Sequence, residues 1–294
     1  MVIWNLELVI WDFIFEHMQA ANAPGSLNSV NILTENIIVL SQFLHRSVKV
    51  DFYLPKNIAS SEISLLFIND GQNMKELGLK PILENLYSED LIEPILCATI
   101  HASHERRMEY GTAIQKDYLG RGAKAGLYTL FILHELLPLI RKKFPQFHFK
   151  QKAFAGFSLG GLMALDIVWN YSGEFTKAGV FSGSLWWRSL DHTHDEYEDE
   201  IHRIMHQQIK KGKYHHGLKF FLTTGSFDET HDRNNNGIID SIDDTIALIN
   251  DLESLGYSNG KDIVYINYED GKHDIATWAR AMPEFLKWGW GKDV

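Results

Sequence analysis

A serine flanked by glycines gives the first indication of chemistry. The segment Gly156-Phe-Ser-Leu-Gly160 fits the pattern G-x-S-x-G around Ser158. This pattern is typical of a tight strand-to-helix turn that presents a serine hydroxyl as a nucleophile, with glycines where strand and helix come close. A strand-like run precedes the motif and an apolar helical pattern follows it. We therefore predict that Ser158 is a nucleophile, and an inert serine in a glycine turn is the alternative.

A base and an acid must accompany such a serine, because its hydroxyl is a weak nucleophile. In enzymes built around this turn, the acid and the histidine follow the serine in chain order. Asp228 and His273 each come soon after a predicted strand, where reacting groups gather in a parallel sheet. We predict Asp228 as the acid and His273 as the base. Glu229 and Asp232 compete with Asp228 for the acid role.

Two backbone N–H groups must hold the oxyanion that forms when the serine attacks a carbonyl. One comes from the residue after the nucleophile, which is Leu159, and the other from an early strand-to-helix loop. We assign the second to Gln72, because Gly71 lets the chain turn that amide towards the reacting carbonyl. A plain β-turn is the alternative interpretation of the segment.

A possible metal site follows the acid candidate. The segment 232–243 (DRNNNGIIDSID) fits D-x-[DN]-x-[DN]-G, the beginning of an EF-hand-type calcium loop, and Gly237 permits its sharp turn. A helix should precede such a loop, whereas a predicted strand precedes this one, so an ion-free turn is the alternative. We expect no cofactor for catalysis, and a structural Ca²⁺ bound by Asp232, Asn234, Asn236, the carbonyl of Ile238, Asp240 and Asp243.

The elements that position these residues form an α/β pattern. Short runs rich in β-branched and aromatic residues alternate with helical patterns from residue 30 onward. We predict two antiparallel strands followed by parallel strands with helical crossovers. The predicted strands are Asn36–Leu40, Ser47–Leu54, Ile63–Ile68, Pro94–Ile100, Lys152–Ala155, Ala178–Phe181, Leu218–Thr223 and Ile263–Tyr268. The predicted helices are Leu127–Lys143, Leu159–Asn170, about Glu196–Lys211, Ile242–Leu255 and Ile275–Trp288.

Length and charge narrow the class of protein. The chain has 294 residues, 45% of them hydrophobic, and no linker that would separate two cores, so we expect one domain over 1–294 with an extension at 1–29. Its 28 Lys and Arg against 38 Asp and Glu give a formal charge of −10, which argues against nucleic acid or an anionic membrane as a partner. No secretory signal or apolar span of about 18 residues is found, so we expect a cytoplasmic protein.

Several motifs in order indicate a family. The chain resembles the putative esterase family of α/β-hydrolases, which includes esterase D, enterochelin esterase, feruloyl esterases and the antigen 85 mycolyltransferases. The resemblance runs from about Ser47 to Trp288. It is carried by SVKVDFYLP, DGQN, ERRMEY, DY followed by HELLP, AGFSLGGLMAL, FSGSLWW and GKHDIATW.

The resemblance implies an α/β-hydrolase fold with a mostly parallel sheet, antiparallel N-terminal strands and helices on both faces. It implies a serine carboxylic-ester hydrolase with a small-molecule ester substrate, in which Ser158, Asp228 and His273 form the triad and the amides of Gln72 and Leu159 the oxyanion hole. Two alternatives remain open. They are acyl transfer to an alcohol instead of water, and a non-catalytic calcium-dependent binding module.

The resemblance also implies residues around the site. Arg107, Glu109 and Tyr110 are expected to line or brace it. Trp186 and Trp187 are expected to border the acyl or alcohol pocket, although a Trp pair at a strand end is as often core as pocket.

Overall fold

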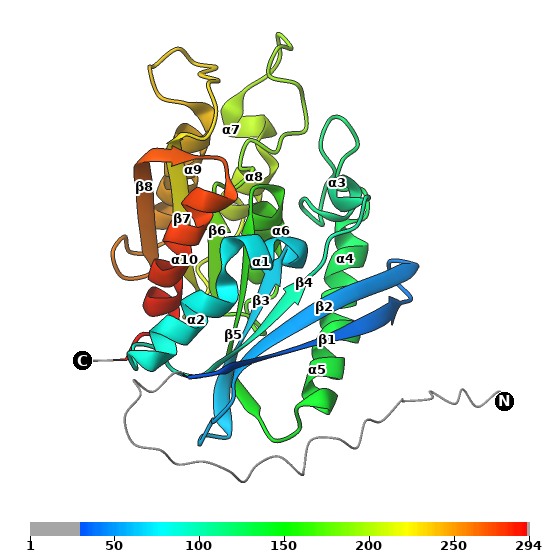
Figure 1. Ribbon diagram of the computed structural model, residues 1–294. Helices are drawn as coiled ribbons and strands as arrows, with labels where there is room; N and C mark the ends of the chain where they lie inside the picture. Colours follow the sequence, from blue (N-terminus) through cyan, green and yellow to red (C-terminus); the bar gives the residue numbers. More distant parts are fainter. Residues whose placement is uncertain (1–29, 293–294) are drawn as a thin grey trace, which may run out of the picture.

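One eight-stranded sheet forms the centre of the computed structural model, which describes residues 30–292 (Figure 1). The predicted extension at 1–29 lies outside the described residues. The strand order is β1-β2-β4-β3-β5-β6-β7-β8, and all pairs beyond β2–β4 are parallel. All eight predicted strands are confirmed, as β1 Ile32–Ser41, β2 Arg46–Pro55, β3 Glu62–Asn69, β4 Ile95–Ile100, β5 His148–Phe157, β6 Lys177–Phe181, β7 Lys219–Phe227 and β8 Ile263–Lys272.

The predicted helices are present, with two interruptions. The first contains a π-helical segment, Ile132–Leu136, and the third is split at Arg203, whose backbone is extended and bridges to Arg188. Three helices, α1 to α3, were not predicted; α1 and α3 have four residues each and α2 has ten. The α-helices are α1 Met74–Leu77, α2 Leu79–Ser88, α3 Arg106–Glu109, α4 Ala125–Phe131, α5 Leu137–Lys143, α6 Leu159–Asn170, α7 Asp199–His202, α8 Ile204–Lys210, α9 Asp240–Ser254 and α10 Ile275–Trp290.

Helices cover both faces of the sheet. In Figure 1, α1, α2 and α10 pack together in front of the strands, and their apolar side chains form one of two core clusters. The other cluster joins the opposite face of the sheet to α4, α5, α6, α8 and α9. Strand β4 is buried along its whole length and β3 along all but its first residue, which explains their continuous apolar sequences. The predicted α/β architecture is confirmed.

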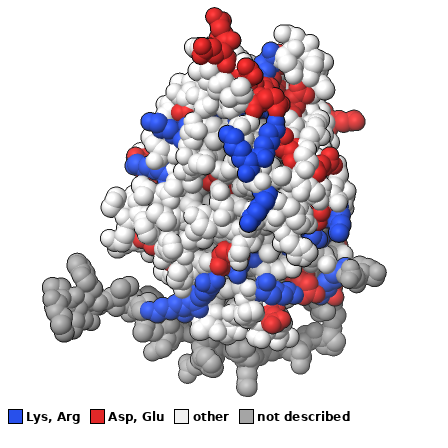
Figure 2. Space-filling model, turned by 180° about the vertical axis from the view of Figure 1, so that it is seen from behind, with Lys and Arg blue, Asp and Glu red and all other residues white. Residues whose placement is uncertain are grey.

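Charge is spread over the molecular surface. Figure 2 shows basic and acidic side chains interspersed among uncharged residues on the face seen there. In residues 30–292, no helix has the length and apolar character that a membrane crossing requires.

The close approach of β5 and α6 fixes the turn at Ser158. A Cβ atom at Gly156 would lie 2.2 Å from the carbonyl oxygen of Gly160, and one at Gly160 would lie 2.7 Å from a carboxylate oxygen of Asp70. Real Cβ atoms do not come so close to backbone atoms, so Gly156 needs to be glycine. A side chain at Gly160 would displace the Asp70 carboxylate, which Arg106 holds in place. The turn places Ser158 at the carboxyl end of β5, between β3 and β6.

We expect Gly156→Ala to lower the free energy of unfolding by roughly 1–3 kcal/mol or more, because the strand must move away from the helix. Urea unfolding would measure the change. Gly173→Ala is the matched control, since no atom lies within 4 Å of a Cβ at that position. Equal stabilities of the two variants would contradict the steric argument.

Candidate active site

Ser158 stands in a strained backbone conformation at the beginning of α6. Its φ of 54° and ψ of −124° are uncommon for a residue with a side chain. The backbone is held there because the Ser158 N–H donates to the carbonyl of Phe181 at 2.9 Å and the Ser158 carbonyl accepts from Gly161 at 3.0 Å. Its hydroxyl lies 3.4 Å from the hydroxyl of Ser184.

The last residues of β7 and β8 bring Asp228 and His273 together. Phe227 pairs with Lys272 after a register shift, so the residues that follow, Asp228 and His273, leave neighbouring strand ends. The Nδ1 atom of His273 lies 4.0 Å from Oδ1 of Asp228, whose side chain is 1% exposed. These two residues are 45 positions apart in the sequence, and the parallel pairing of the strands makes them neighbours.

Two donors orient the Asp228 carboxylate. The backbone N–H of Gly225 donates to Oδ2 at 3.0 Å, and the Ser182 hydroxyl donates to Oδ1 at 3.2 Å. The indole N–H of Trp278 in turn donates to the Ser182 oxygen at 3.0 Å. A buried carboxylate with charge-assisted hydrogen bonds keeps a fixed orientation.

One cavity of about 250 Å³ is lined by all three predicted triad residues. In the described part of the chain no hydrogen bond joins Ser158 to His273. Such contacts are commonly long in free enzymes and shorten when substrate binds. Glu229, the competing acid, also lines this cavity, whereas Asp232 does not. The other lining residues are Ser182, Gly183, Ser184, Trp186 and Ser241.

Partial burial lowers the pKa of His273 below its ordinary value of 6.5, while 39% of its side-chain surface stays exposed. The negative charge of Asp228 raises this pKa and the positive charge of Arg106 lowers it, but the desolvation of the ring is the largest effect. The ring packs edge-on against Trp278 at 5.3 Å between centroids. A neutral imidazole at pH 7 is the form that can accept a proton.

The loop after β3 lies against the serine turn. Asp70 has a left-handed backbone with φ of 62° and accepts two hydrogen bonds from Arg106, at 2.6 and 2.8 Å. Arg106 also donates to the Phe157 carbonyl at 3.3 Å, and the Asn69 amide donates to the Gly160 carbonyl at 2.8 Å. These bonds tie the end of β3 to the beginning of α6.

Both predicted oxyanion donors lie at helix beginnings. Leu159 is the first residue of α6, and Gln72 is the second residue of a 3₁₀ helix, Gly71–Asn73. The first N–H groups of a helix have no partner within it and are available to a ligand. The Gln72 side chain bridges the loop, because its amide donates to Asp70 and accepts from the backbone of Ala102.

Three of the residues expected from the resemblance do not line this cavity. Glu109 is fully buried and accepts two hydrogen bonds from Arg46, both 2.7 Å long, so it joins α3 to β2. Tyr110 is also fully buried, and its ring lies under the Arg106 guanidinium at 5.1 Å. Arg107 is exposed. Glu109 and Tyr110 thus contact Arg46 and Arg106 from within the core.

The two tryptophans differ. Trp186 lines the cavity, whereas Trp187 is fully buried and packs against Gly111 and Gly122, where Cβ atoms would lie 2.6 and 2.7 Å from its ring. The expectation that Trp187 borders the pocket is therefore corrected. Trp187 is a core residue.

Three residues that support the site were missed. Ser182, Trp278 and Arg106 all stand in segments used for the resemblance, but nothing in their spacing indicated which groups they contact. Ser182 lies 46 and Trp278 50 residues from Asp228 along the chain. Their roles follow from the meeting of strand ends, which sequence spacing does not show.

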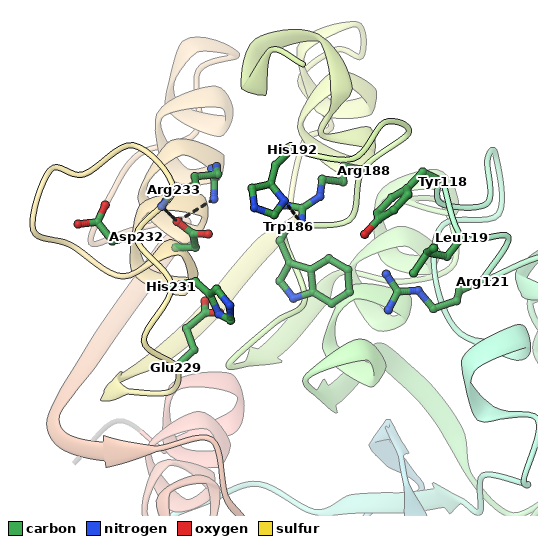
Figure 3. Close-up of a pocket in the computed structure, with 11 residues that line it drawn as sticks. Tyr118, Leu119, Arg121, Trp186, Arg188, His192, Glu229, His231, Asp232 and Arg233 are labelled. Atoms are coloured by element: carbon green, nitrogen blue, oxygen red, sulfur yellow. Dashed lines mark hydrogen bonds and ion pairs between the residues drawn. The ribbon is translucent and has the colours of Figure 1, made fainter. Parts of the chain in front are cut away.

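A second cavity, of about 520 Å³, adjoins the first, and Trp186 and Glu229 line both (Figure 3). Trp186 lies between two groups of side chains. Tyr118, Arg121 and Arg188 lie on one side, and Glu229 and His231 on the other. The aromatic ring thus connects the two spaces.

A buried ion-pair cluster holds the wall of the second cavity. Arg233 pairs with Asp199 at 2.7 Å, with Asp240 at 3.2 Å and with Asp244 at 2.5 Å. Arg203 pairs with the same Asp244 at 2.8 Å. The cluster joins α7, α8 and α9 to the segment after Asp228.

The predicted calcium loop is compact, but its donors contact one another. The amides of Asn234 and Asn236 donate to Asp243 at 2.8 and 2.7 Å, and Asp232 accepts from the backbone of Gly237 at 2.8 Å. In the described residues no group of three or more His, Cys, Asp and Glu side chains could hold a metal ion. Asp240, an expected ligand, is buried and faces Arg233, so we correct its role to that of an ion-pair partner.

We expect the imidazole of His273 to titrate with an apparent pKa below 6.5. Asp228→Asn should lower it further, because the variant removes the negative charge that stabilises the imidazolium. Proton–carbon NMR of the ring, assigned with His273→Gln, would measure both values. Asp90→Asn, at an exposed carboxylate, is the control. A pKa at or above 6.5 in the wild type would contradict the dominance of burial.

Comparisons with known proteins identify the family and the fold of the chain. The family described as Putative esterase matches residues 41–288. A siderophore triacetylfusarinine C esterase of Aspergillus fumigatus is 31% identical over 85 residues, which are 29% of each chain. A solved enterobactin esterase from Shigella flexneri is 22% identical with a TM-score of 0.67, covering 87% of this chain and 58% of that one.

A siderophore hydrolase from Aspergillus nidulans is also similar. It is 17% identical with a TM-score of 0.61, and the match covers 91% of this chain and 97% of that one. The predicted α/β-hydrolase fold is thereby confirmed. Because the family matches most of the chain, from the second strand to the last helix, the protein belongs to the putative esterase family.

Proposed function

We propose that this protein is a serine carboxylic-ester hydrolase that works through an acyl-enzyme. The observation that carries the proposal is the single cavity lined by Ser158, Asp228 and His273 in a chain of the putative esterase family. A nucleophile, a base and an acid at neighbouring strand ends are the groups that acyl transfer needs.

Each residue has a step in the proposed reaction. His273 takes the proton of Ser158 as the serine oxygen attacks the ester carbonyl, and Asp228 stabilises the imidazolium. The N–H groups of Leu159 and Gln72 hold the oxyanion. The alcohol leaves with the proton from His273, and water activated by the same histidine releases the acid.

Small-molecule esters are the proposed substrates. One relative is described as a siderophore esterase, another as a siderophore hydrolase and a third as an enterobactin esterase. Siderophore esters are therefore the first substrates to assay. The chain spans about three-fifths of the enterobactin esterase chain, and that substrate therefore enters here as part of the proposal.

The decisive measurement is hydrolysis of p-nitrophenyl acetate and butyrate by the wild type and by Ser158→Ala. We expect a loss of several powers of ten in kcat, because without the nucleophile only binding and the oxyanion hole remain. Ser88→Ala, at the exposed end of α2, should leave turnover unchanged.

Two results would count against the hydrolase. Turnover by Ser158→Ala equal to that of the wild type would exclude Ser158 as the nucleophile. An inactive wild type in which a fluorophosphonate fails to label Ser158 would favour the non-catalytic binding module.

We also propose that the loop 232–243 binds Ca²⁺. Asp232 and Asp243 converge with the amides of Asn234 and Asn236, and the α9 helix begins at Asp240, as the exiting helix of such a loop would. Binding would require both amides to turn their oxygens towards the ion, next to the carbonyl of Ile238. Asp240 is excluded from this ligand set because it pairs with Arg233.

Millimolar Ca²⁺ should raise the melting temperature and EDTA should lower it, because an ion that binds only the folded state stabilises it. Differential scanning fluorimetry would measure the shift. Asp243→Ala should abolish the response, and Asp195→Ala, at an exposed carboxylate outside the loop, should keep it. A wild-type melting temperature that neither Ca²⁺ nor EDTA changes would refute the calcium site.

A further inference from the structure

The second cavity contains a cation without a carboxylate partner. Among residues 30–292, no carboxylate oxygen forms an ion pair with Arg188, although it lines the cavity. Its Nη2 atom donates to Nδ1 of His192 at 3.0 Å, and the same ring nitrogen lies 3.2 Å from Oδ1 of Asp191. Its Nε atom is buried and has no hydrogen-bond partner in the described part of the chain. A buried donor without a partner is costly, so the Arg188 guanidinium keeps hydrogen-bonding capacity that no described residue uses.

The other arginines of this cavity are neutralised. Arg121 pairs with the buried Asp117 at 2.5 Å and lies over the Trp186 ring at 4.8 Å. Arg233 is surrounded by the three aspartates of the buried cluster. The contrast singles out Arg188 as the positive group whose charge remains available.

Aromatic rings surround the same guanidinium. Arg188 lies over the rings of Tyr118 and Tyr197, at 5.9 and 5.8 Å to their centroids. Trp186 lines both cavities and lies below Arg188 in Figure 3. The Arg121 guanidinium covers one face of its ring, so the surface left for a ligand is the other face. A planar ligand could stack on this surface while its charged end meets the guanidinium.

Negative groups lie on the opposite wall. Asp240 is paired with Arg233, and Asp232, which also lines the cavity, accepts hydrogen bonds from the backbone N–H groups of Asn236 and Gly237. Glu229 lies below His231, and burial raises the pKa of its carboxyl, with the charge of Asp240 acting in the same direction. The side of the cavity with Arg188 is therefore the side that suits an anion.

We propose that the second cavity is a substrate subsite for an aromatic carboxylate, with Arg188 binding the carboxylate and Trp186 the ring. The proposal rests on the proposed function, because it makes this cavity the place where part of an ester substrate is recognised. It names a substrate class, esters whose acyl or alcohol part carries an acidic aromatic ring.

Direct binding tests the subsite independently of catalysis. Ligand-observed NMR titrations of the full chain would compare benzoate with benzamide, which has the same shape and no charge. We expect benzoate to bind the wild type at least tenfold more tightly than benzamide. Arg188→Gln should remove this preference, and Arg188→Lys should retain part of it, because lysine keeps the charge but not the bidentate geometry. Arg141→Gln, at an exposed arginine of α5, is the matched control and should retain the full preference.

Catalysis then tests whether the subsite serves the reaction. The matched substrates are 4-acetoxybenzoate and 4-acetoxybenzamide, and the measured quantity is the ratio of their kcat/KM values. We expect Arg188→Gln to lower that ratio about tenfold relative to the wild type. The intrinsic reactivities of the two esters cancel when the ratio for the variant is divided by the ratio for the wild type, because both proteins hydrolyse the same two esters.

The outcomes separate the two proposals. Equal binding of benzoate and benzamide by the wild type, or an unchanged preference in Arg188→Gln, would overturn the subsite whatever the enzyme does. Tight benzoate binding that Arg188→Gln weakens, with neither acetate ester hydrolysed, would keep the subsite as an anion site and count against the hydrolase. A melting temperature of Arg188→Lys near that of the wild type would show that the comparison is made on folded protein.

Discussion

The turn at Ser158 depends on how closely two backbones can approach. Strand β5 and helix α6 meet with no room for a side chain at Gly156, and Gly160 packs against Asp70 and Asn69 at the end of β3. The positive φ of Ser158 lies between these two contacts. Hydrogen bonds from residues outside the turn hold this strained conformation. The Asn69 amide donates to the first turn of α6, and Arg106 donates both to Asp70 and to the Phe157 carbonyl. The residues that border the cavity are arranged around a backbone that cannot relax without moving the end of β3 as well.

The positions of the acid and the base depend on another feature, which is the extension of two neighbouring strands. β7 and β8 continue as a pair past a register shift at Gly225, so Asp228 and His273 leave the sheet at the same height. The backbones at Gly225 and Gly271 come so close here that a Cβ atom on Gly225 would lie 2.5 Å from backbone atoms of Gly271. Two effects on the pKa of His273 oppose each other. Burial of the ring lowers this pKa, and the negative charge of Asp228 raises it.

Sequence reasoning found the parts whose signals are local. Strands, most helices and the turn at Ser158 follow from runs and spacings, and helix α6 begins and ends at the predicted residues. It did not find Glu109's partner, Arg46, which is 63 residues away. It could not separate Trp186 from Trp187, because adjacent side chains in an irregular segment point in different directions and only packing decides which is buried. Asp240 has the right position for a calcium ligand, but the charge of Arg233 next to it gives it another role.

The cluster around Arg233 has a consequence for the entropy of association. It joins α7, α8 and α9 to the segment after Asp228 through buried charges, so the wall of the second cavity is already ordered before a molecule enters. Ordering a loop during binding costs about 1–2 kcal/mol for each residue that is fixed. A preformed wall avoids that cost, so contacts made in the cavity translate more fully into affinity.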